Sequence, residues 1–359
     1  MSEPRTHSRL PHFLATLYGL AIVYASLQPF ANWMAPPPNA VFFLFAPWPP
    51  RWVRYDFVTN LVAYIPLGFF VALIPRNTPP AARLATAVGA GALLSLSMET
   101  LQAFLPMRDA SMADLISDTA GALVGGALAV AFARSQDAKR AVVATRNRWF
   151  LSGLTGDIGI ALIAIWLVVQ VNPAIPLFAT MYDPSLLPGA APAARDVAAT
   201  LVEAAHSAFQ LLGVGLFLAL LLRERRYVGG AALLLVGAAA LVKGVAAAIL
   251  LKPAAWENWL TPPVSLGVAA GAHLLSVAIW LPRPVQVTLA AIALLSSLLA
   301  ALFAPDLVYA RAPVGLFNGP YGHLLNFNGL THTVLLLWPA VACAFLFALA
   351  GRPGWGEPG

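Results

Sequence analysis

Residues 95–126 read S-L-S-M-E-T-L-Q-A-F-L-P-M-R-D-A-S-M-A-D-L-I-S-D-T-A-G-A-L-V-G-G, which we interpret as the end of one apolar helix, a short polar turn and the start of the next helix. Charged side chains make up only 10% of the whole chain, yet this stretch is rich in them. A concentration of charge in so apolar a chain makes the turn the best candidate for a functional site. Its ionisable residues are Glu99, Arg108, Asp109, Asp114 and Asp118, with Gln102 as a neutral polar neighbour.

The composition around this turn is that of a membrane protein. Of the 359 residues, 60% are hydrophobic, and the mean hydropathy is +0.77; soluble domains average roughly 45–50% apolar and 25% charged residues. A helix needs about 20 mostly apolar residues to cross a bilayer, and lipid offers no partner to a bare backbone N–H or C=O. The sequence therefore predicts an all-α polytopic transmembrane bundle of about ten helices, at residues 11–30, 57–75, 83–105, 112–133, 157–177, 198–222, 229–251, 262–281, 285–304 and 329–349.

The distribution of lysine and arginine predicts how these helices are oriented. If the N-terminus is cytoplasmic, most of the 21 basic residues fall in cytoplasmic segments, above all in residues 134–150. The positive-inside rule then places both termini in the cytoplasm. This pattern accounts for the net charge of +6, so we predict membrane lipids and not nucleic acid as partners.

A weak internal repeat is visible between the two halves of the chain. Residues 65–76, I-P-L-G-F-F-V-A-L-I-P-R, resemble residues 212–223, L-G-V-G-L-F-L-A-L-L-L-R, at an offset of 147. This is consistent with a degenerate tandem repeat of four helices, followed by two additional helices. The predicted organisation is a four-helix transmembrane domain at 1–135, a basic cytoplasmic loop at 136–156, a second four-helix unit at 157–283, and two further helices with a short cytoplasmic tail at 284–359.

The second, third and fourth predicted helices bring polar side chains to a similar depth. Each carries two of them, three or four positions apart, on one face near its outer end. A carboxylate at mid-bilayer costs about 2.5–3.5 kcal/mol on insertion scales, so several are tolerable only if they face inward, pair or reach water. We therefore predict an outward-facing acidic pocket. Its candidate ligand-binding residues are Asp56, Asn60, Glu99, Gln102, Arg108, Asp114 and Asp118.

Simpler roles are open for some of these residues. Asp56 and Asp114 could cap their helices, because a carboxylate complements a helix N-terminus. Glu99 lies in the C-terminal half of its helix, where the helix dipole disfavours an acid, so we expect a function or a buried pair with Arg108.

The second half of the chain lacks most of the acidic positions. Glu203 shares a helix face with His206 and Gln210, but one E-x-x-H motif falls short of a two-metal site, which needs two such motifs and more acids. We therefore predict no metal and no cofactor. Lys243 is interpreted as a satisfied core residue, and the lone Cys343 as a small buried hydrophobe.

Three motifs are similar to those of the VanZ-like family. They are D-F-V-T-N-L-V-A-Y-I-P-L-G at 56–68, M-E-T-L-Q-A-F-L-P-M-R at 98–108 and S-M-A-D-L-I-S-D-T-A-G-A-L-V-G at 111–125. The resemblance covers about residues 10–135. It departs at Asp118, where the family usually has asparagine, so this chain carries an additional negative charge. The matching positions are Asp56, Asn60, Pro66, Gly68, Glu99, Gln102, Arg108, Asp114 and Gly121.

The resemblance implies a protein of the bacterial inner membrane that acts in the cell envelope. The family is named for antibiotic resistance to teicoplanin, a lipoglycopeptide that acts on cell-wall precursors outside the membrane. We therefore predict that the pocket binds a lipid-linked envelope precursor or a lipoglycopeptide. The acids would accept hydrogen bonds from hydroxyls, amines or amides, and Arg108 would pair with phosphate or carboxylate.

Two other functions stay open. One is an intramembrane enzyme that modifies an envelope lipid or glycan, with Glu99 as general acid and base. The other is a transporter or flippase, which the repeat suggests. The sequence contains no recognisable serine–histidine pair, metal cluster or phosphate-binding loop, so we favour binding over catalysis.

Overall fold

Helices form the regular structure of the chain. The computed structural model describes residues 8–28, 30–35, 40–45, 54–75, 77–105, 108, 110–178, 192–257, 259–303 and 321–352. In these ranges eleven α-helices and three short 3-10 helices occur without a β-strand, so the predicted all-α fold is confirmed. The chain divides into two compact units, Met1–Asn147 and Arg148–Gly359, which we call the N-terminal and C-terminal units.

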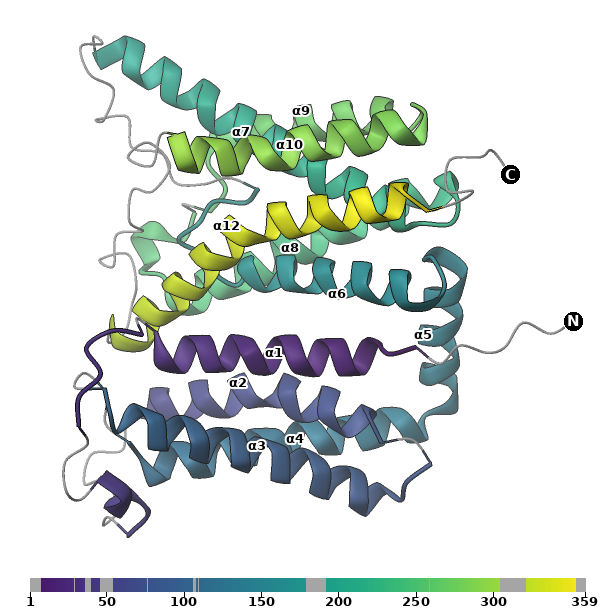
Figure 1. Cartoon of the computed structure of the whole chain (residues 1–359). Coiled ribbons are helices and arrows are strands. Elements are labelled where there is room, and N and C mark those ends of the chain that lie inside the picture. Colours follow the sequence, from purple (N-terminus) through teal and green to yellow (C-terminus); the bar gives the residue numbers. More distant parts are fainter. Residues whose placement is uncertain are drawn as a thin grey trace, which may run out of the picture. The chain divides into compact units, whose positions relative to one another are not determined.

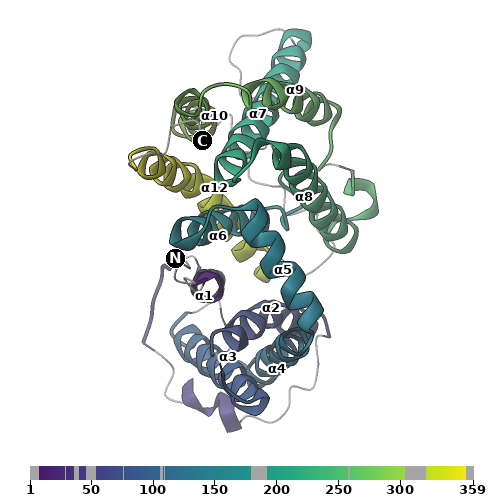
Figure 2. The same cartoon turned by 90° about the vertical axis from the view of Figure 1, so that its right-hand side faces the viewer.

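Within the N-terminal unit, α1, α2, α3 and α4 lie side by side, and α5 runs across their direction (Figure 1). Seen nearly end-on, α2, α3 and α4 surround a common axis, and α1 packs beside α2 and α3 (Figure 2). The Tyr18 hydroxyl of α1 donates a hydrogen bond to the Ala63 carbonyl of α2 at 3.0 Å. The elements are α1 (Leu10–Leu27), η1 (Ala40–Phe45), α2 (Arg54–Leu73), α3 (Pro80–Gln102), α4 (Met112–Arg134) and most of α5 (Gln136–Trp149), which lies in the predicted basic loop.

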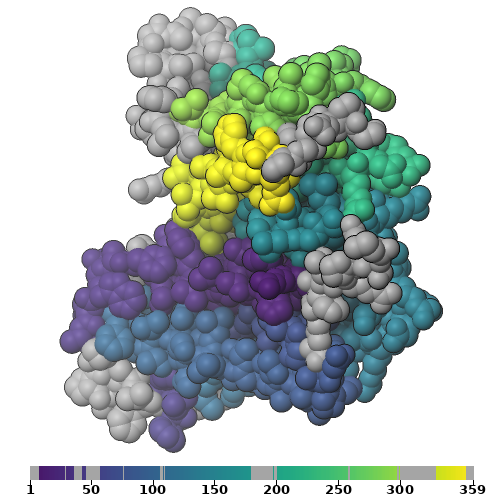
Figure 3. Space-filling model, turned by 45° about the vertical axis from the view of Figure 1, so that its right-hand side comes forward, coloured from purple at the N-terminus to yellow at the C-terminus, as the bar shows by residue number. Residues whose placement is uncertain are grey.

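The C-terminal unit is built around α7, which packs against α6, α8, α9 and α10. α12 packs against α6 and α10, and the surfaces of α10 and α12 adjoin in Figure 3. The core of this unit includes Phe217 of α7, which is fully buried against Trp338 of α12. The elements are α6 (Gly153–Val169), α7 (Pro192–Leu221), η3 (Arg225–Tyr227), α8 (Val228–Leu250), η4 (Pro253–Ala255), α9 (Pro262–Ala278), α10 (Arg283–Phe303) and α12 (Tyr321–Ala350).

Ten of the described helices are apolar enough to lie in a membrane. Six are also long enough to cross it, namely α1, α3, α4 and the apolar parts of α7, α8 and α12. Four shorter apolar helices lie within α2, α6, α9 and α10. Each of the ten overlaps one of the ten segments predicted from the sequence, although the ends differ: α6 ends at Val169, whereas the prediction ran to residue 177. Large apolar side chains face outward, such as Leu233 and Leu241 of α8, which suits contact with lipid.

The closest helix contact in the N-terminal unit runs between α2 and α4. A Cβ added to Gly121 would meet the carbonyl oxygen of Leu61, and one added to Gly125 would meet that of Ile65. The two glycines are four residues apart and therefore lie on one face of α4. Only glycine allows the two backbones to approach this closely, as in other small-residue contacts between membrane helices. We call this contact the α2–α4 glycine seam.

The C-terminal unit contains the same kind of contact between α7 and α9. A Cβ at Gly267 would meet the Ala204 carbonyl oxygen, and a Cβ at Gly271 would meet the Ala208 carbonyl oxygen. The spacing of four residues recurs on both helices. This contact, the α7–α9 glycine seam, gives each unit a pair of helices held at backbone distance.

A buried lysine holds the chain where α6 ends. Lys243 of α8 is fully buried, and its Nζ donates hydrogen bonds to the carbonyls of Asn172 at 2.7 Å and Ile175 at 2.8 Å. The Asn172 side chain in turn donates to the Thr331 hydroxyl of α12 at 2.8 Å. α8, α12 and the turn after α6 are thereby tied together in a buried polar joint.

Candidate functional site

The candidate site forms where α3 ends and α4 begins. Ser111 caps α4, because its side chain accepts a hydrogen bond from the Ala113 N–H at 3.2 Å. Asp114 therefore lies in the first turn of α4, and the alternative that it caps the helix is wrong. A carboxylate in the first turn still complements the helix dipole.

Glu99 is buried in the last turn of α3, with 4% of its surface exposed. Its Oε2 accepts a hydrogen bond from the backbone N–H of Ser111 at 2.6 Å. This charge-assisted bond joins the end of α3 to the cap of α4. Arg108, Asp114 and Asp118 all lie within electrostatic range of Glu99. The expected partner Arg108 thus acts through space, as one member of a wider cluster of charges.

Asp118 lies one turn after Asp114 in α4 and is 5% exposed. Its Oδ2 accepts a hydrogen bond from the Ser95 hydroxyl of α3 at 2.7 Å, and the Tyr64 hydroxyl of α2 lies beside both groups. Its other oxygen, Oδ1, is buried and has no hydrogen-bond partner among the described residues. Buried polar atoms in folded proteins nearly always have a partner. Asp118 Oδ1 is therefore a buried acceptor without a donor among the described residues.

Arg108 is half-buried in the turn between α3 and α4. Burial lowers the pKa of its guanidinium, while the charges of Glu99 and Asp114 act in the opposite direction. An arginine stays protonated at neutral pH even so. The described cluster therefore places one cation among Glu99, Asp114 and Asp118, and with all three acids ionised it would carry net negative charge.

The remaining predicted residues surround this cluster. The Gln102 side chain donates a hydrogen bond to the Ser26 carbonyl of α1 at 3.0 Å, so it joins α3 to α1. Asn60 is half-buried on α2, one turn before Tyr64. Asp56 lies near the start of α2, and its side chain, with the capping role considered for it, lies outside the described residues.

Sequence reasoning missed Tyr64, Ser95 and Ser111. Ser95 precedes Glu99 by four residues, and Tyr64 follows Asn60 by four, so helical spacing places each beside a predicted residue. Ser111 precedes the apolar run of α4, as N-cap residues do. Single serines and tyrosines are ordinary in membrane helices, and this is why only the charged residues stood out.

The C-terminal unit repeats one detail of this site. Glu203 of α7 accepts a hydrogen bond at 2.8 Å from Thr261, whose side chain also caps α9. In both units an acid is thus bonded to the N-cap residue of a helix whose glycines form a seam. Nearby, Nε2 of His206 is buried without a partner among the described residues. Those residues contain no group of three or more side chains placed to hold a metal ion.

Comparison with known proteins agrees with the sequence motifs. Residues 6–133 match the family model described as VanZ/LLP1. The match spans α1 to α4 and so contains every residue of the acidic cluster, whereas the C-terminal unit lies outside it. No curated protein and no solved structure matches the chain. Residues 6–133 of this membrane protein therefore form a domain that is similar to the VanZ-like family.

Proposed function

We propose that the VanZ-like domain binds a cell-envelope ligand through the acidic cluster of Glu99, Asp114 and Asp118. The observation that carries the proposal is Asp118 Oδ1, a buried carboxylate oxygen without a partner among the described residues. A hydroxyl, amine or amide of a ligand would donate to it. Such a bond is worth more than one in water, because the acceptor has already lost its hydration.

The ligand class follows from the charges of the site. Three acids around one arginine suit a molecule that offers several donors and one anionic group. Arg108 would pair with a phosphate or carboxylate, since its planar guanidinium presents parallel donors. A lipid-linked envelope precursor and a lipoglycopeptide both have this chemistry, and the family name supports an envelope role. At position 118 the family usually has asparagine, whose amide can donate a hydrogen bond. The carboxylate of Asp118 only accepts, so it needs a donor from another group.

The proposed location is the bacterial inner membrane, with both termini in the cytoplasm and the acidic cluster facing outward. Arg83 lies in the first turns of α3 and Arg134 in the last turn of α4. Both are at the end of the unit opposite Glu99 and Ser111. The positive-inside rule places that basic end in the cytoplasm.

Cysteine labelling tests this orientation. In a Cys343→Ala background, we expect a membrane-impermeant maleimide to label Ala110→Cys in intact cells. Ala141→Cys of α5 should be labelled only after permeabilisation, because it lies in the basic segment that the positive-inside rule retains in the cytoplasm. Labelling of both positions in intact cells, or of Ala141→Cys alone, would contradict the orientation.

The binding function is tested with single variants of the cluster. We expect Asp118→Asn and Arg108→Gln each to weaken binding of fluorescent teicoplanin to cells by about tenfold, because each removes one charged hydrogen bond. Glu99→Gln should keep the bond to Ser111 through its amide oxygen and lose affinity less. Susceptibility to teicoplanin, compared with that of cells lacking the protein, provides the phenotype.

The matched control is Asp137→Asn, which removes one carboxylate from the exposed helix α5 at the basic end. It should leave binding and susceptibility unchanged. If Asp118→Asn and Arg108→Gln insert normally and behave like Asp137→Asn, the cluster is structural. If they bind as well as the natural protein while a modified envelope product disappears, the domain is an enzyme.

A further inference from the structure

Helix α5 differs from the apolar helices in direction and in composition. In Figure 1 it runs across α1–α4 of the N-terminal unit, at the end where α4 stops. One residue separates its start at Gln136 from the end of α4, and residues 150–152 separate its end at Trp149 from the start of α6. None of its residues is buried. α5 is therefore an exposed helix that is held at both ends by apolar helices.

The short connections keep α5 at the membrane surface. An α-helix rises about 1.5 Å per residue, so α5 with 14 residues is about 20 Å long and α6 with 17 residues about 25 Å. Residues 150–152 bridge at most about 14 Å. An upright α5 would therefore lift the start of α6 by about 6 Å, although α6 is already shorter than the roughly 30 Å hydrocarbon core. α5 thus lies along the surface, in agreement with its direction in Figure 1.

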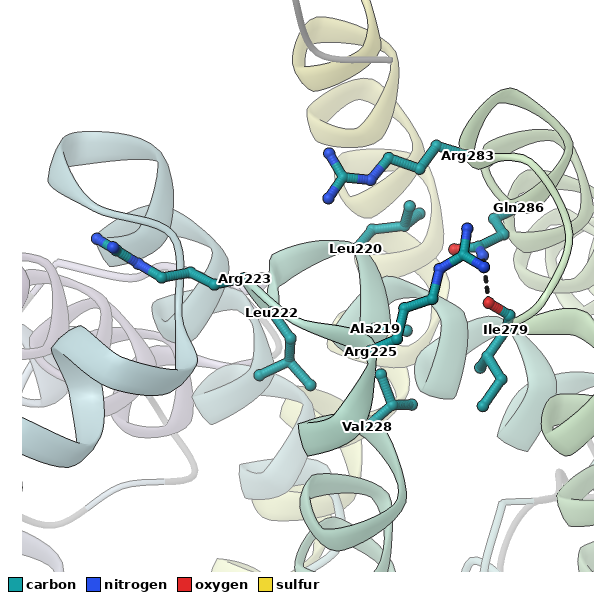
Figure 4. A pocket seen from close by; sticks show the side chains of 9 residues that line it. All are labelled: Ala219, Leu220, Leu222, Arg223, Arg225, Val228, Ile279, Arg283 and Gln286. Atoms are coloured by element: carbon teal, nitrogen blue, oxygen red, sulfur yellow. Dashed lines mark hydrogen bonds between the residues drawn. The ribbon is translucent and has the colours of Figure 1, made fainter. Parts of the chain in front are cut away.

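The C-terminal end of α5 is fixed by contacts within the C-terminal unit. The Trp149 ring stacks on Tyr227 with ring centroids 5.5 Å apart, and the Trp149 carbonyl accepts a hydrogen bond from the Arg223 N–H at 2.8 Å. The Arg223 side chain donates from Nε to the Phe150 carbonyl at 2.9 Å. In Figure 4, Arg223 accordingly points away from Arg225. The end of α5 thus has a defined path.

One face of α5 is apolar. Ala138, Val142, Thr145 and Trp149 follow one another at intervals of three or four residues, which places them along one stripe of the helix. We call it the α5 stripe. Polar and apolar residues are separated more clearly on α5 than on any other described helix. Val142, in the middle of the stripe, has 55% of its surface exposed. The protein therefore leaves much of this apolar side chain uncovered.

Basic side chains flank the α5 stripe. Lys139 precedes Val142 by three positions and Arg148 follows Thr145 by three, so each lies beside the stripe. Both are exposed, and neither forms an ion pair with another described residue. Arg148 instead donates to a neutral partner, the hydroxyl of Tyr227, at 2.8 Å.

The surroundings of these side chains carry little negative charge. Residues 134–148 contain five lysines and arginines and one acid, Asp137. The other described acids of the N-terminal unit lie at its opposite end, where α3 ends and where α2 and α4 begin. The positive charge around α5 is therefore complementary to an anionic surface.

We infer that α5 lies in the headgroup layer of the membrane and binds anionic phospholipids. Lys139 and Arg148 contact the lipid phosphates, while the α5 stripe faces the acyl chains. Basic amphipathic helices with tryptophan on the apolar face bind membrane surfaces in this way. The inference is independent of the function proposed for the acidic cluster. Only the assignment to the cytoplasmic leaflet rests on the orientation proposed for the domain.

A fluorescent probe on the full chain in vesicles tests this inference. In a Cys343→Ala background, Val142→Cys carries a dye whose emission shifts to shorter wavelength in apolar surroundings. In vesicles of phosphatidylglycerol and phosphatidylcholine we expect this shift, and we expect brominated acyl chains to quench the dye. Ala144→Cys, an exposed position on the opposite face of α5, is the matched control. Its dye should emit as in water and be quenched by iodide.

The preference for anionic lipid is measured at the same position. Brominated phosphatidylglycerol should quench the dye at Val142→Cys more strongly than brominated phosphatidylcholine. We expect Lys139→Gln to reduce this preference about fivefold, because one basic residue near an anionic surface contributes about 1 kcal/mol. Lys139→Arg keeps the charge and should keep the preference. Arg140→Gln removes a charge from the face opposite Val142 and should reduce the preference less.

Three results would overturn the inference. Emission at Val142→Cys equal to that at Ala144→Cys would place α5 in water. A shifted emission that brominated lipids do not quench would show that protein covers the stripe, from this chain or from a second copy. Equal quenching by the two brominated lipids would show contact with lipid without a preference for anionic headgroups.

Discussion

Replacement of Gly125 by leucine is expected to prevent the N-terminal unit from folding. A Cβ at this position meets the backbone of α2 at Ile65 and lies 2.7 Å from the nitrogen of Phe69. These are backbone atoms, so no side chain can rotate away. Overpacking costs about 1–3 kcal/mol where side chains can adjust. The cost here should exceed that range, and only a small fraction of the purified protein should elute as a single folded species.

Gly89→Ala provides the matched control for this prediction. Gly89 lies within α3 of the same unit, and an added Cβ there would meet nothing within 4 Å. Alanine should therefore raise stability slightly, by about 0.5–1 kcal/mol, because glycine is a poor helix former. Unfolding midpoints in detergent measure both variants. A midpoint for Gly125→Leu equal to that of Gly89→Ala would show that α2 and α4 are not in backbone contact.

Replacement of Lys243 by methionine is the second large expected effect. Methionine replaces the apolar stem of lysine but leaves the carbonyls of Asn172 and Ile175 without their donor. Each unsatisfied buried carbonyl costs about 1–3 kcal/mol. Removing a buried ammonium recovers part of this cost. We expect a net loss of about 2–4 kcal/mol in the free energy of unfolding.

The control for Lys243→Met is Leu241→Met on the same helix. Leu241 is 69% exposed on the apolar surface, so a similar apolar side chain there should change little. Tryptophan fluorescence during thermal unfolding compares the two variants. If Lys243→Met unfolds at the same midpoint temperature as the natural chain, the buried polar joint does not hold α8 to the turn after α6.

The helices could be predicted from the sequence because apolar runs of spanning length leave few alternatives in lipid. Glu99 and Asp118 could be placed at one site because paired polar positions on successive antiparallel helices must meet at the same end. The capping alternative for Asp114 failed because serine three residues earlier competes for the cap position. The helix α5 was not predicted, because a search for apolar membrane spans treats a basic segment between two spans as a loop.

Other parts of the structure depend on packing that no local pattern reveals. Tyr64 reaches Asp118 only because Gly121 brings α2 and α4 together. Lys243 could be recognised as a core residue. Its partners could not be predicted, because the carbonyls of Asn172 and Ile175 follow the end of α6, and hydropathy does not locate that end.

The two glycine seams have a consequence for biosynthesis. Each seam joins helices from one continuous stretch of chain: the first lies within residues 54–134 and the second within 192–278. The earlier seam can therefore close while the later one is still on the ribosome. A chain arrested during translation after α5 would already contain both halves of the first contact.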